Sequence, residues 1–179
     1  MAGMRGKQSV RNMVLSLSVS SLAAAGIYVF GVPHDENNDP IKTVDYEVDL
    51  KTVRRAASYP VAAPKDGALP KGWRATSVRY TPQSDVGAVW HLGFLDPDRE
   101  YVAIEQSDGR PGPFVDEVTQ SARKTEKTEK IAGETWQRYE GPKYDALVRE
   151  GKGVTTVVTG TASFAQLTKM AAALDARKG

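Results

Sequence analysis

The chain has 179 residues, a formal net charge of +2 at pH 7 and no cysteine. The lack of cysteine excludes disulfides, thiol catalysis and cysteine-rich metal sites. The basic residues between 123 and 130 are interleaved with Glu126 and Glu129, which is typical of a solvated strand face, so we predict no nucleic-acid partner.

Residues 13–32 form a run of 20 residues without a charged side chain. A helix of that length spans a hydrocarbon core of about 30 Å. Three basic residues precede the run and three acidic residues follow it, namely Arg5, Lys7 and Arg11, then Asp35, Glu36 and Asp39. The positive-inside rule therefore predicts a cytoplasmic basic head at 1–12, a transmembrane signal anchor at 13–32 and a C-terminal part outside the cell.

Secretion with cleavage is the alternative for this segment, because Ala23 to Ala25 provide an A-x-A site. Cleavage after Ala25 would leave an apolar new terminus around Ile27 and Phe30, and no cysteine follows that could carry a lipid. We therefore favour an uncleaved anchor in the cell membrane.

Residues 33–66 are predicted to be a stalk and connector. Val44, Tyr46, Val48 and Leu50 alternate with acidic residues, which favours a half-buried strand at 44–50, and a short helix capped by Asp49 is expected to follow, through residue 57. The stretch 59–73 contains three prolines and is expected to be an extended connector, because proline supplies no N–H to a strand ladder. The extracytoplasmic domain is predicted to cover 67–179.

A β-hairpin can be read in register from the segment "VWHLGFLDPDREYVAIEQSD", residues 89–108. The residues 96–99 have the composition of a turn, with Pro97 at its second position. Centring the turn there predicts four opposed pairs: Phe94 with Val102, Leu92 with Ile104, His91 with Glu105, and Leu95 with Tyr101.

The pair of His91 and Glu105 is the main titratable constellation in this hairpin. A carboxylate beside the imidazole favours its protonated form and provides a pH response. The alternative is a cross-strand surface pair that contributes well under about 1 kcal/mol. Both interpretations remain open at this stage.

The remaining chain predicts two helices and two more hairpins. "GPFVDEVTQSARK", residues 112–124, reads as a helix with Pro113 in its first turn, and hairpins are expected to turn near Gly133 and at 151–153. The last segment, 163–179, reads as a helix with a capping box of Ser163 and Gln166 and with Arg177 and Lys178 at its C-terminal end. The fold class is therefore α+β: an antiparallel sheet with helices packed against it, preceded by one N-terminal transmembrane helix.

Four segments carry a family resemblance. "LPKGWRATSVRY", "WHLGFLDPDREYVAIEQS", "GETWQRYEG" and "ALVREGKGVTTVVTGTASFAQL", in that order behind an N-terminal span, resemble an actinobacterial family of single-pass membrane proteins known as domain-of-unknown-function family 4245. The resemblance covers most of the chain. It implies an uncleaved signal anchor and an extracytoplasmic domain, and it carries over no catalytic residue.

Enzyme signatures are scarce. Residues 121–124 match the S-x-x-K motif of penicillin-binding enzymes, but neither S-D-N nor K-T-G occurs, so we interpret them as part of a surface helix. His34 lies near Asp35, Glu36 and Asp39, but a linker has no second shell to orient such ligands. We predict no catalytic residues, no metal site, no cofactor and no enzymatic activity.

The sequence therefore predicts a membrane-anchored extracytoplasmic domain that acts as a non-catalytic binding or accessory module at the cell envelope. Its partner would be an envelope protein, a lipid or a cell-wall component, and its oligomeric state is left open. The alternative is a cell-envelope hydrolase around His91, which requires a concave pocket where His91 meets an acid or a hydroxyl. Candidate ligand or partner contacts are Trp73, His91 and Glu105. Trp90 and Trp136 are expected in the core, whereas Trp73 follows a Pro-Gly connector and is a candidate to line a cleft at the sheet edge.

Overall fold

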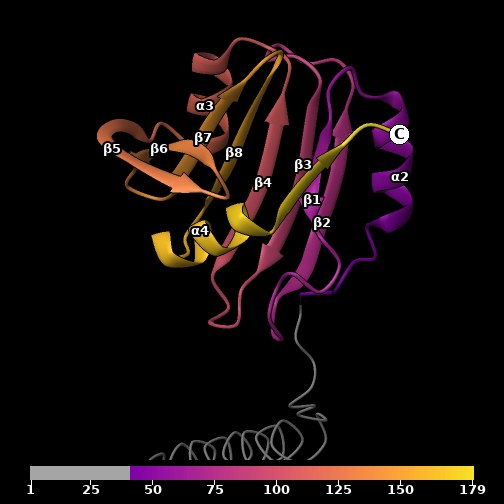
Figure 1. The fold of residues 1–179 in the computed structure, drawn as a ribbon, viewed down its shortest axis with the longest axis horizontal. Helices are drawn as coiled ribbons and strands as arrows, with labels where there is room; N and C mark the ends of the chain where they lie inside the picture. The colour runs from indigo at the N-terminus through magenta and orange to yellow at the C-terminus, as the bar shows by residue number, and fades with distance from the viewer. Residues whose placement is uncertain (1–40) are drawn as a thin grey trace, which may run out of the picture. The chain divides into compact units, whose positions relative to one another are not determined.

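The alternating segments of the sequence build a seven-stranded antiparallel sheet in the computed structural model, which describes residues 41–179 (Figure 1). The strands lie in the order β2-β3-β4-β8-β7-β6-β5. Their bounds are Arg74–Thr81 for β2, Val89–Leu95 for β3, Tyr101–Ser107 for β4, Arg123–Ile131 for β5, Glu134–Glu140 for β6, Asp145–Gly151 for β7 and Val154–Gly160 for β8. The predicted α+β class with an antiparallel sheet is confirmed.

A short ribbon and three helices complete the described fold. Strand β1 (Val61–Pro64) pairs antiparallel with β9 (Leu174–Arg177), which follows helix α4 (Phe164–Ala173) directly. Helix α2 (Glu47–Ala56) lies beside β1 and β2, and the C-terminus ends next to it (Figure 1). Helix α3 (Pro111–Thr119) connects β4 to β5.

The two faces of the sheet have different covers. On one side, here called the ribbon face, β1 and α4 pack on the strands and enclose the larger core. Its fully buried side chains include Trp90, Leu92, Ile104, Leu147, Val158, Leu167 and Met170. On the other side, the α3 face, Phe114 and Val115 pack over Val148 and Val157 in a smaller cluster. Helix α3 packs over β4, β7 and β8, so the helix covers one part of this face rather than all seven strands.

Buried polar side chains connect the ribbon to the sheet. The Trp90 Nε1–H donates to the Ala62 carbonyl at 3.0 Å, and the Gln106 Oε1 accepts the Ala62 N–H at 2.7 Å. The Gln106 Nε2 in turn donates to Thr156 Oγ1 at 3.0 Å. These bonds satisfy groups that would otherwise be buried without partners, and such groups cost about 1–3 kcal/mol each.

The predicted hairpins are confirmed. In β3 and β4, all four predicted pairs occur, including His91 opposite Glu105. The Asp96 carboxylate accepts the N–H groups of Asp98 and Glu100, each at 2.9 Å, which fixes the turn between the two strands. The β5–β6 turn has Gly133 at φ 87°, and the β7–β8 turn has Gly153 at φ 77°, a backbone region that favours glycine.

The strand predicted at 44–50 is wrong, because helix α2 occupies Glu47–Ala56. Leu50 and Val53 in α2, and Ala57 just after the helix, are buried at spacings of three and four positions, so one stripe of the helix faces the core. Val48, by contrast, is 71 % exposed. Asp49 does not cap the helix. The N-cap residue is Tyr46, and the Asp45 carboxylate accepts the Glu47 N–H at 3.1 Å.

The segment predicted as a stalk and connector also contributes to the core. Strand β1 lies within the expected connector, and its Val61 and Ala63 are fully buried. Residues 41–179 pack as one unit, so the domain does not begin at residue 67 as predicted. The four-residue strand escaped prediction because its two alanines and flanking prolines carry no alternation.

Two helix ends differ from the prediction. Helix α3 ends at Thr119, because Gln120 and Ser121 adopt left-handed conformations at φ 55° and 70°, so residues 121–124 lie in a turn and the start of β5 rather than on a helix. Helix α4 ends at Ala173, and Arg177 lies in β9 instead of at a helix terminus. Ser163 is the N-cap residue of α4, but its side chain makes no capping bond.

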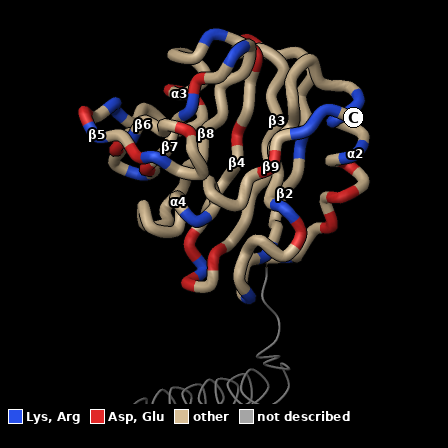
Figure 2. The backbone as a smooth tube through the Cα atoms, in the orientation of Figure 1, with Lys and Arg blue, Asp and Glu red and all other residues tan. Residues whose placement is uncertain are grey.

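The basic residues of β5 lie at the outer edge of the sheet, where Lys, Arg and Glu alternate along the strand (Figure 2). Arg123, Lys124, Lys127 and Lys130 carry the positive charge of this strand, and its surface is largely solvated, as the sequence predicts. Glu129 bonds Arg138 on the neighbouring strand.

The predicted basic head, signal anchor and acidic stalk, together with the residues around His34, lie outside the described residues. Between residues 41 and 179, no helix is both long and apolar enough to cross a membrane.

Replacing Trp90 with Phe tests the connection between the sheet and the ribbon. The variant leaves the buried Ala62 carbonyl without its indole donor and removes side-chain volume, so we expect a loss of about 1–3 kcal/mol in the free energy of unfolding. Chemical denaturation followed by circular dichroism measures it. The control is Val48→Ala, an exposed position where the change should stay within about 0.5 kcal/mol. Equal effects at both positions would contradict this account of the core.

Candidate functional site

A hollow of about 440 Å³ lies on the α3 face beside helix α3, and it is called here the His91 pocket. Strands β2, β3, β4 and β8 supply part of its lining, and the loop before β3, the end of α3 and the loop before β7 supply the rest. Most of its lining side chains carry hydrogen-bonding or charged groups: Arg79, Thr81, Ser84, His91, Tyr101, Glu105, Glu117, Gln120, Tyr144 and Thr159. Its size is within the range of small-molecule sites.

His91 and Glu105 form a short hydrogen bond inside this pocket. The His91 Nδ1 lies 2.6 Å from Glu105 Oε1, and the two side chains are only 13 % and 10 % exposed. The predicted pairing is confirmed. The alternative of a surface pair is wrong, because both side chains are largely shielded from solvent.

Ser77 on β2 adds a second hydrogen bond to His91, and no sequence pattern predicts that Ser77 lies beside this imidazole. Its Oγ lies 2.8 Å from the His91 Nε2. In the neutral imidazole, Nδ1–H donates to the carboxylate, which leaves Nε2 to accept the proton of the Ser77 hydroxyl. The structure therefore brings a hydroxyl, an imidazole and a carboxylate into one line across three adjacent strands.

A β-bulge places Ser77 on this face. Ala75 pairs with Phe94, but Ser77 pairs with Gly93, so Thr76 is an extra residue in β2. Because side chains alternate along a strand, one inserted residue moves all later side chains of β2 to the opposite face. Ser77 and Arg79 thereby face His91 instead of the ribbon-face core.

Gly93 leaves room for the Ser77 side chain. A Cβ atom at Gly93 would clash with Ser77 Oγ and would lie 3.3 Å from the Tyr101 hydroxyl. Any larger residue would displace one of the two groups. The absence of a side chain at this position therefore allows Ser77 to reach the imidazole on the same strand as the glycine.

Burial raises the pKa of the Glu105 carboxyl, while the hydrogen bond and charge of His91, and the nearby Arg79, act in the opposite direction. Burial also raises the pKa of Tyr101, and the charge of Glu105 adds to that shift. The Tyr101 phenol therefore remains protonated at neutral pH and can donate a hydrogen bond.

Trp73 belongs to a different hollow, of about 320 Å³, on the ribbon side of the sheet. Its ring packs edge-on against Phe94 at 6.5 Å between ring centroids. Its buried Nε1–H has no hydrogen-bond partner within the part of the chain that the structure describes. The structure thus brings His91 and Glu105 together and leaves Trp73 apart from them. Trp90 and Trp136 are in the core, as expected.

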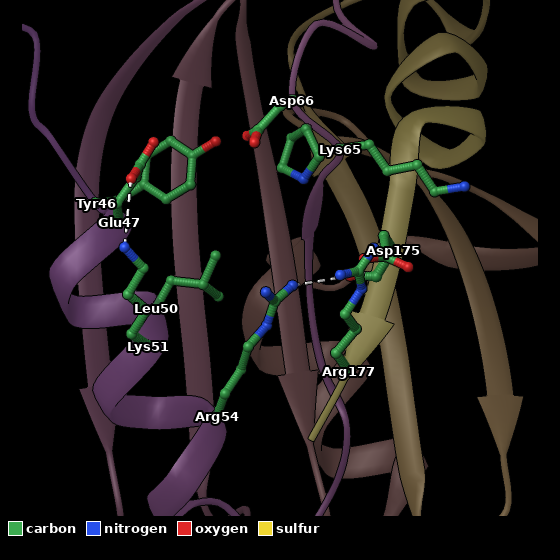
Figure 3. Close-up of a pocket in the computed structure, with 10 residues that line it drawn as sticks. Tyr46, Glu47, Leu50, Lys51, Arg54, Lys65, Asp66, Asp175 and Arg177 are labelled. Carbon is green, nitrogen blue, oxygen red and sulfur yellow. Dashed lines mark hydrogen bonds and ion pairs between the residues drawn. The ribbon is translucent and has the colours of Figure 1, made fainter. Parts of the chain in front are cut away.

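A third hollow, of about 400 Å³, lies between α2 and the end of the ribbon (Figure 3). Several basic side chains line this hollow, but two of them already bond to other groups of the protein. Arg54 donates to the carbonyls of Val61 and Asp175 at 3.4 and 3.3 Å, and Lys51 pairs with Glu47 at 3.7 Å. The guanidinium of Arg54 thus serves to hold α2 against the ribbon, and we do not assign this hollow a ligand.

The His91 pocket meets the condition for a hydrolase, because an imidazole meets an acid and hydroxyls in a concave site. Residues 41–179 contain no cluster of three or more His, Asp or Glu side chains arranged to hold an ion.

The family model described as "Protein of unknown function (DUF4245)" matches residues 5–174. The chain belongs to this family. The resemblance inferred from the four sequence segments is therefore confirmed at the level of the family. No curated protein and no solved structure matches the chain.

Replacing Glu105 with Gln tests the cost of the buried carboxyl. A raised pKa in the folded state means that folding favours the protonated form, so stability falls as the pH rises from about 4.5, the ordinary value, through the folded-state pKa. The amide still accepts the His91 Nδ1–H but carries no charge. We expect the variant to unfold at higher temperature than the wild type at pH 7, with the difference vanishing below about pH 4.

Thermal unfolding from about pH 3.5 to about pH 8 measures this effect. Glu126→Gln on exposed β5 is the matched control and should show no such pH-dependent gain. A Glu105→Gln variant that is less stable at pH 7 would show that the interaction with His91 outweighs the cost of burial.

Proposed function

We propose that this chain is a single-pass membrane protein whose domain binds a polyhydroxylated component of the cell envelope, a cell-wall saccharide, in the His91 pocket. Residues 13–32 are the anchor, the N-terminus is cytoplasmic and the domain is extracytoplasmic. The charge distribution around residues 13–32 supports this topology. The observation that carries the binding proposal is the concentration of polar groups in the His91 pocket.

The composition of the pocket favours a neutral, hydroxyl-rich ligand. Arg79 offers a charged donor, and Glu117 and Glu105 offer acceptors, so cations and anions are both present and no single-sign field selects a phosphate. Tyr101 and Tyr144 lie 5.9 Å apart between ring centroids and add amphipathic surfaces. A saccharide presents both hydroxyl groups and apolar C–H faces, which match this mixture.

Hydrolysis at the same pocket is the second candidate function. One observation favours it, namely the contact of the Ser77 hydroxyl with the His91 Nε2 at 2.8 Å.

The topology has a direct test. Protease added to intact protoplasts is expected to degrade residues 41–179 while leaving the basic head protected, and a C-terminal epitope should disappear without detergent. A domain that stays protected until detergent is added, or a mature chain found free in the medium and beginning at Gly26, would contradict the topology.

Binding is tested with the full chain in detergent micelles and muropeptides released from cell wall by lysozyme. Titration calorimetry is expected to give saturable binding, and Arg79→Ala should weaken it about tenfold or more, because a hydrogen bond to a charged group contributes about 1.5–3 kcal/mol. Arg123→Ala, an exposed arginine on β5, removes the same charge away from the pocket and should bind like the wild type. Binding of phospholipid vesicles or of an envelope protein, without binding of muropeptides, would overturn the saccharide assignment.

A further inference from the structure

The Ser77, His91 and Glu105 side chains are connected in the order that nucleophilic catalysis requires. The hydroxyl lies 2.8 Å from one imidazole nitrogen, and the carboxylate lies 2.6 Å from the other. A base within hydrogen-bond reach of a serine, itself oriented by a third group, is the general signature of an activated nucleophile. Glu105 is buried, whereas Ser77 is partly exposed.

Several features of the local backbone serve this arrangement. The bulge at Thr76 turns Ser77 toward His91, and Gly93 provides the space that its side chain occupies. The Glu105 carboxyl is buried beside His91, and burial raises its pKa. Buried titratable groups with a specific hydrogen-bond partner are typical of sites arranged for chemistry.

Two donors lie near the serine. The Tyr101 hydroxyl and Ser77 Oγ both lie within 3.3 Å of the position that a Cβ of Gly93 would take. Arg79 stands opposite His91 in the ladder and lines the same pocket. A protonated phenol and a guanidinium are suitable donors to an oxyanion that develops when a serine attacks a carbonyl group.

We propose that the His91 pocket is the site of an esterase, in which Ser77 is the nucleophile and the substrate is an O-acylated saccharide of the envelope. This inference rests on the proposed binding function. The Tyr101 ring lies beside Gly93, with its edge carbon 3.2 Å from where a Cβ of that residue would stand, so the aromatic ring is close to the serine that would carry the acyl group.

The reaction balances with water as its only co-reactant. The Ser77 Oγ attacks the carbonyl carbon as its proton passes to the His91 Nε2. The tetrahedral intermediate expels the sugar alkoxide, which takes that proton and leaves as the alcohol, with the acyl group bonded to Ser77. Water then attacks the acyl carbon and gives a proton to His91, and the carboxylic acid leaves as the proton returns to Ser77. Glu105 is a positioning residue that holds the imidazole in the required tautomer.

Active-site labelling tests the nucleophile in the full chain. Diisopropyl fluorophosphate is expected to phosphorylate Ser77, as located by peptide mass spectrometry, and His91→Gln should slow that labelling at least about 100-fold. Ser84 serves as an internal control, because it lines the same pocket but bonds to the Gly87 carbonyl at 2.7 Å. Ser77 labelling that is absent, or no faster than that of Ser84, would overturn the inference.

Turnover is tested with O-acetylated muropeptides by measuring acetate release. Ser77→Ala should lower kcat at least about 1,000-fold. Glu105→Gln should lower kcat with little change in KM and alter the pH profile, whereas loss of structure alone would lower both labelling and binding. Arg123→Ala should match the wild type.

The binding function and the esterase inference can be disproved independently of each other. If Ser77→Ala still binds de-acetylated muropeptides but neither it nor the wild type releases acetate, the binding function stands and the esterase inference is wrong. If the wild type binds no muropeptide at all, the proposed function fails. Wild-type turnover with Ser77→Ala equally active would also exclude Ser77 as the nucleophile.

Discussion

One extra residue in β2, at the bulge beside Ser77, decides which side chains of that strand face His91. Before the bulge, Ala75 faces the ribbon-face core opposite Phe94. After it, Ser77 bonds to His91 and Arg79 lines the His91 pocket, while Val78 and Tyr80 pack against the larger core. Because side chains alternate strictly along a strand, removing the bulge would exchange these two sets. The polar pocket and the apolar core therefore depend on the same local feature.

The unequal covers of the two sheet faces produce the pocket. On the ribbon face, β1 and α4 enclose large side chains, and the ribbon is connected to the sheet through Trp90 and Gln106. On the opposite face, α3 packs over β4, β7 and β8. The stability of the domain thus comes mainly from the ribbon face, which leaves part of the α3 face able to carry polar and titratable groups.

The buried carboxyl of Glu105 combines these two constraints. Burial disfavours its charged form, and the imidazole of His91 with the charge of Arg79 offsets part of that cost. Gly93 permits the serine to contact the same imidazole. The contact between Ser77 and His91 thus depends on the lack of a side chain at Gly93 on the neighbouring strand. The buried Glu105 carboxyl depends on the opposite charges of His91 on β3 and Arg79 on β2.

The local hairpins and one half of the site are predictable from the order of the amino acids alone. The alternation in 89–108, with turn residues at 96–99, fixed the pairing of His91 with Glu105, since neighbouring segments and a short turn leave little freedom of register. The sequence indicated the helix that ends near residue 57 but not where α2 begins, because the alternation in 44–50 favours a strand and only packing of Leu50 and Val53 against the core selects the helix from Glu47 onward. Nor did it reveal Ser77, since the long connection between β2 and β3 sets no register.

Three features arise only when the chain is packed: the pairing of β1 with β9, the bulge at Thr76 and the burial of Glu105. Strands β1 and β9 are short and lie far apart in the chain, so neither carries a periodic signal that could identify the other. Glu105 shares its pocket with the end of α3 and with Tyr144, which come from separate parts of the chain. Contacts of this kind arise from the packing of distant elements, whereas the hairpins arise from interactions between residues that are close in sequence.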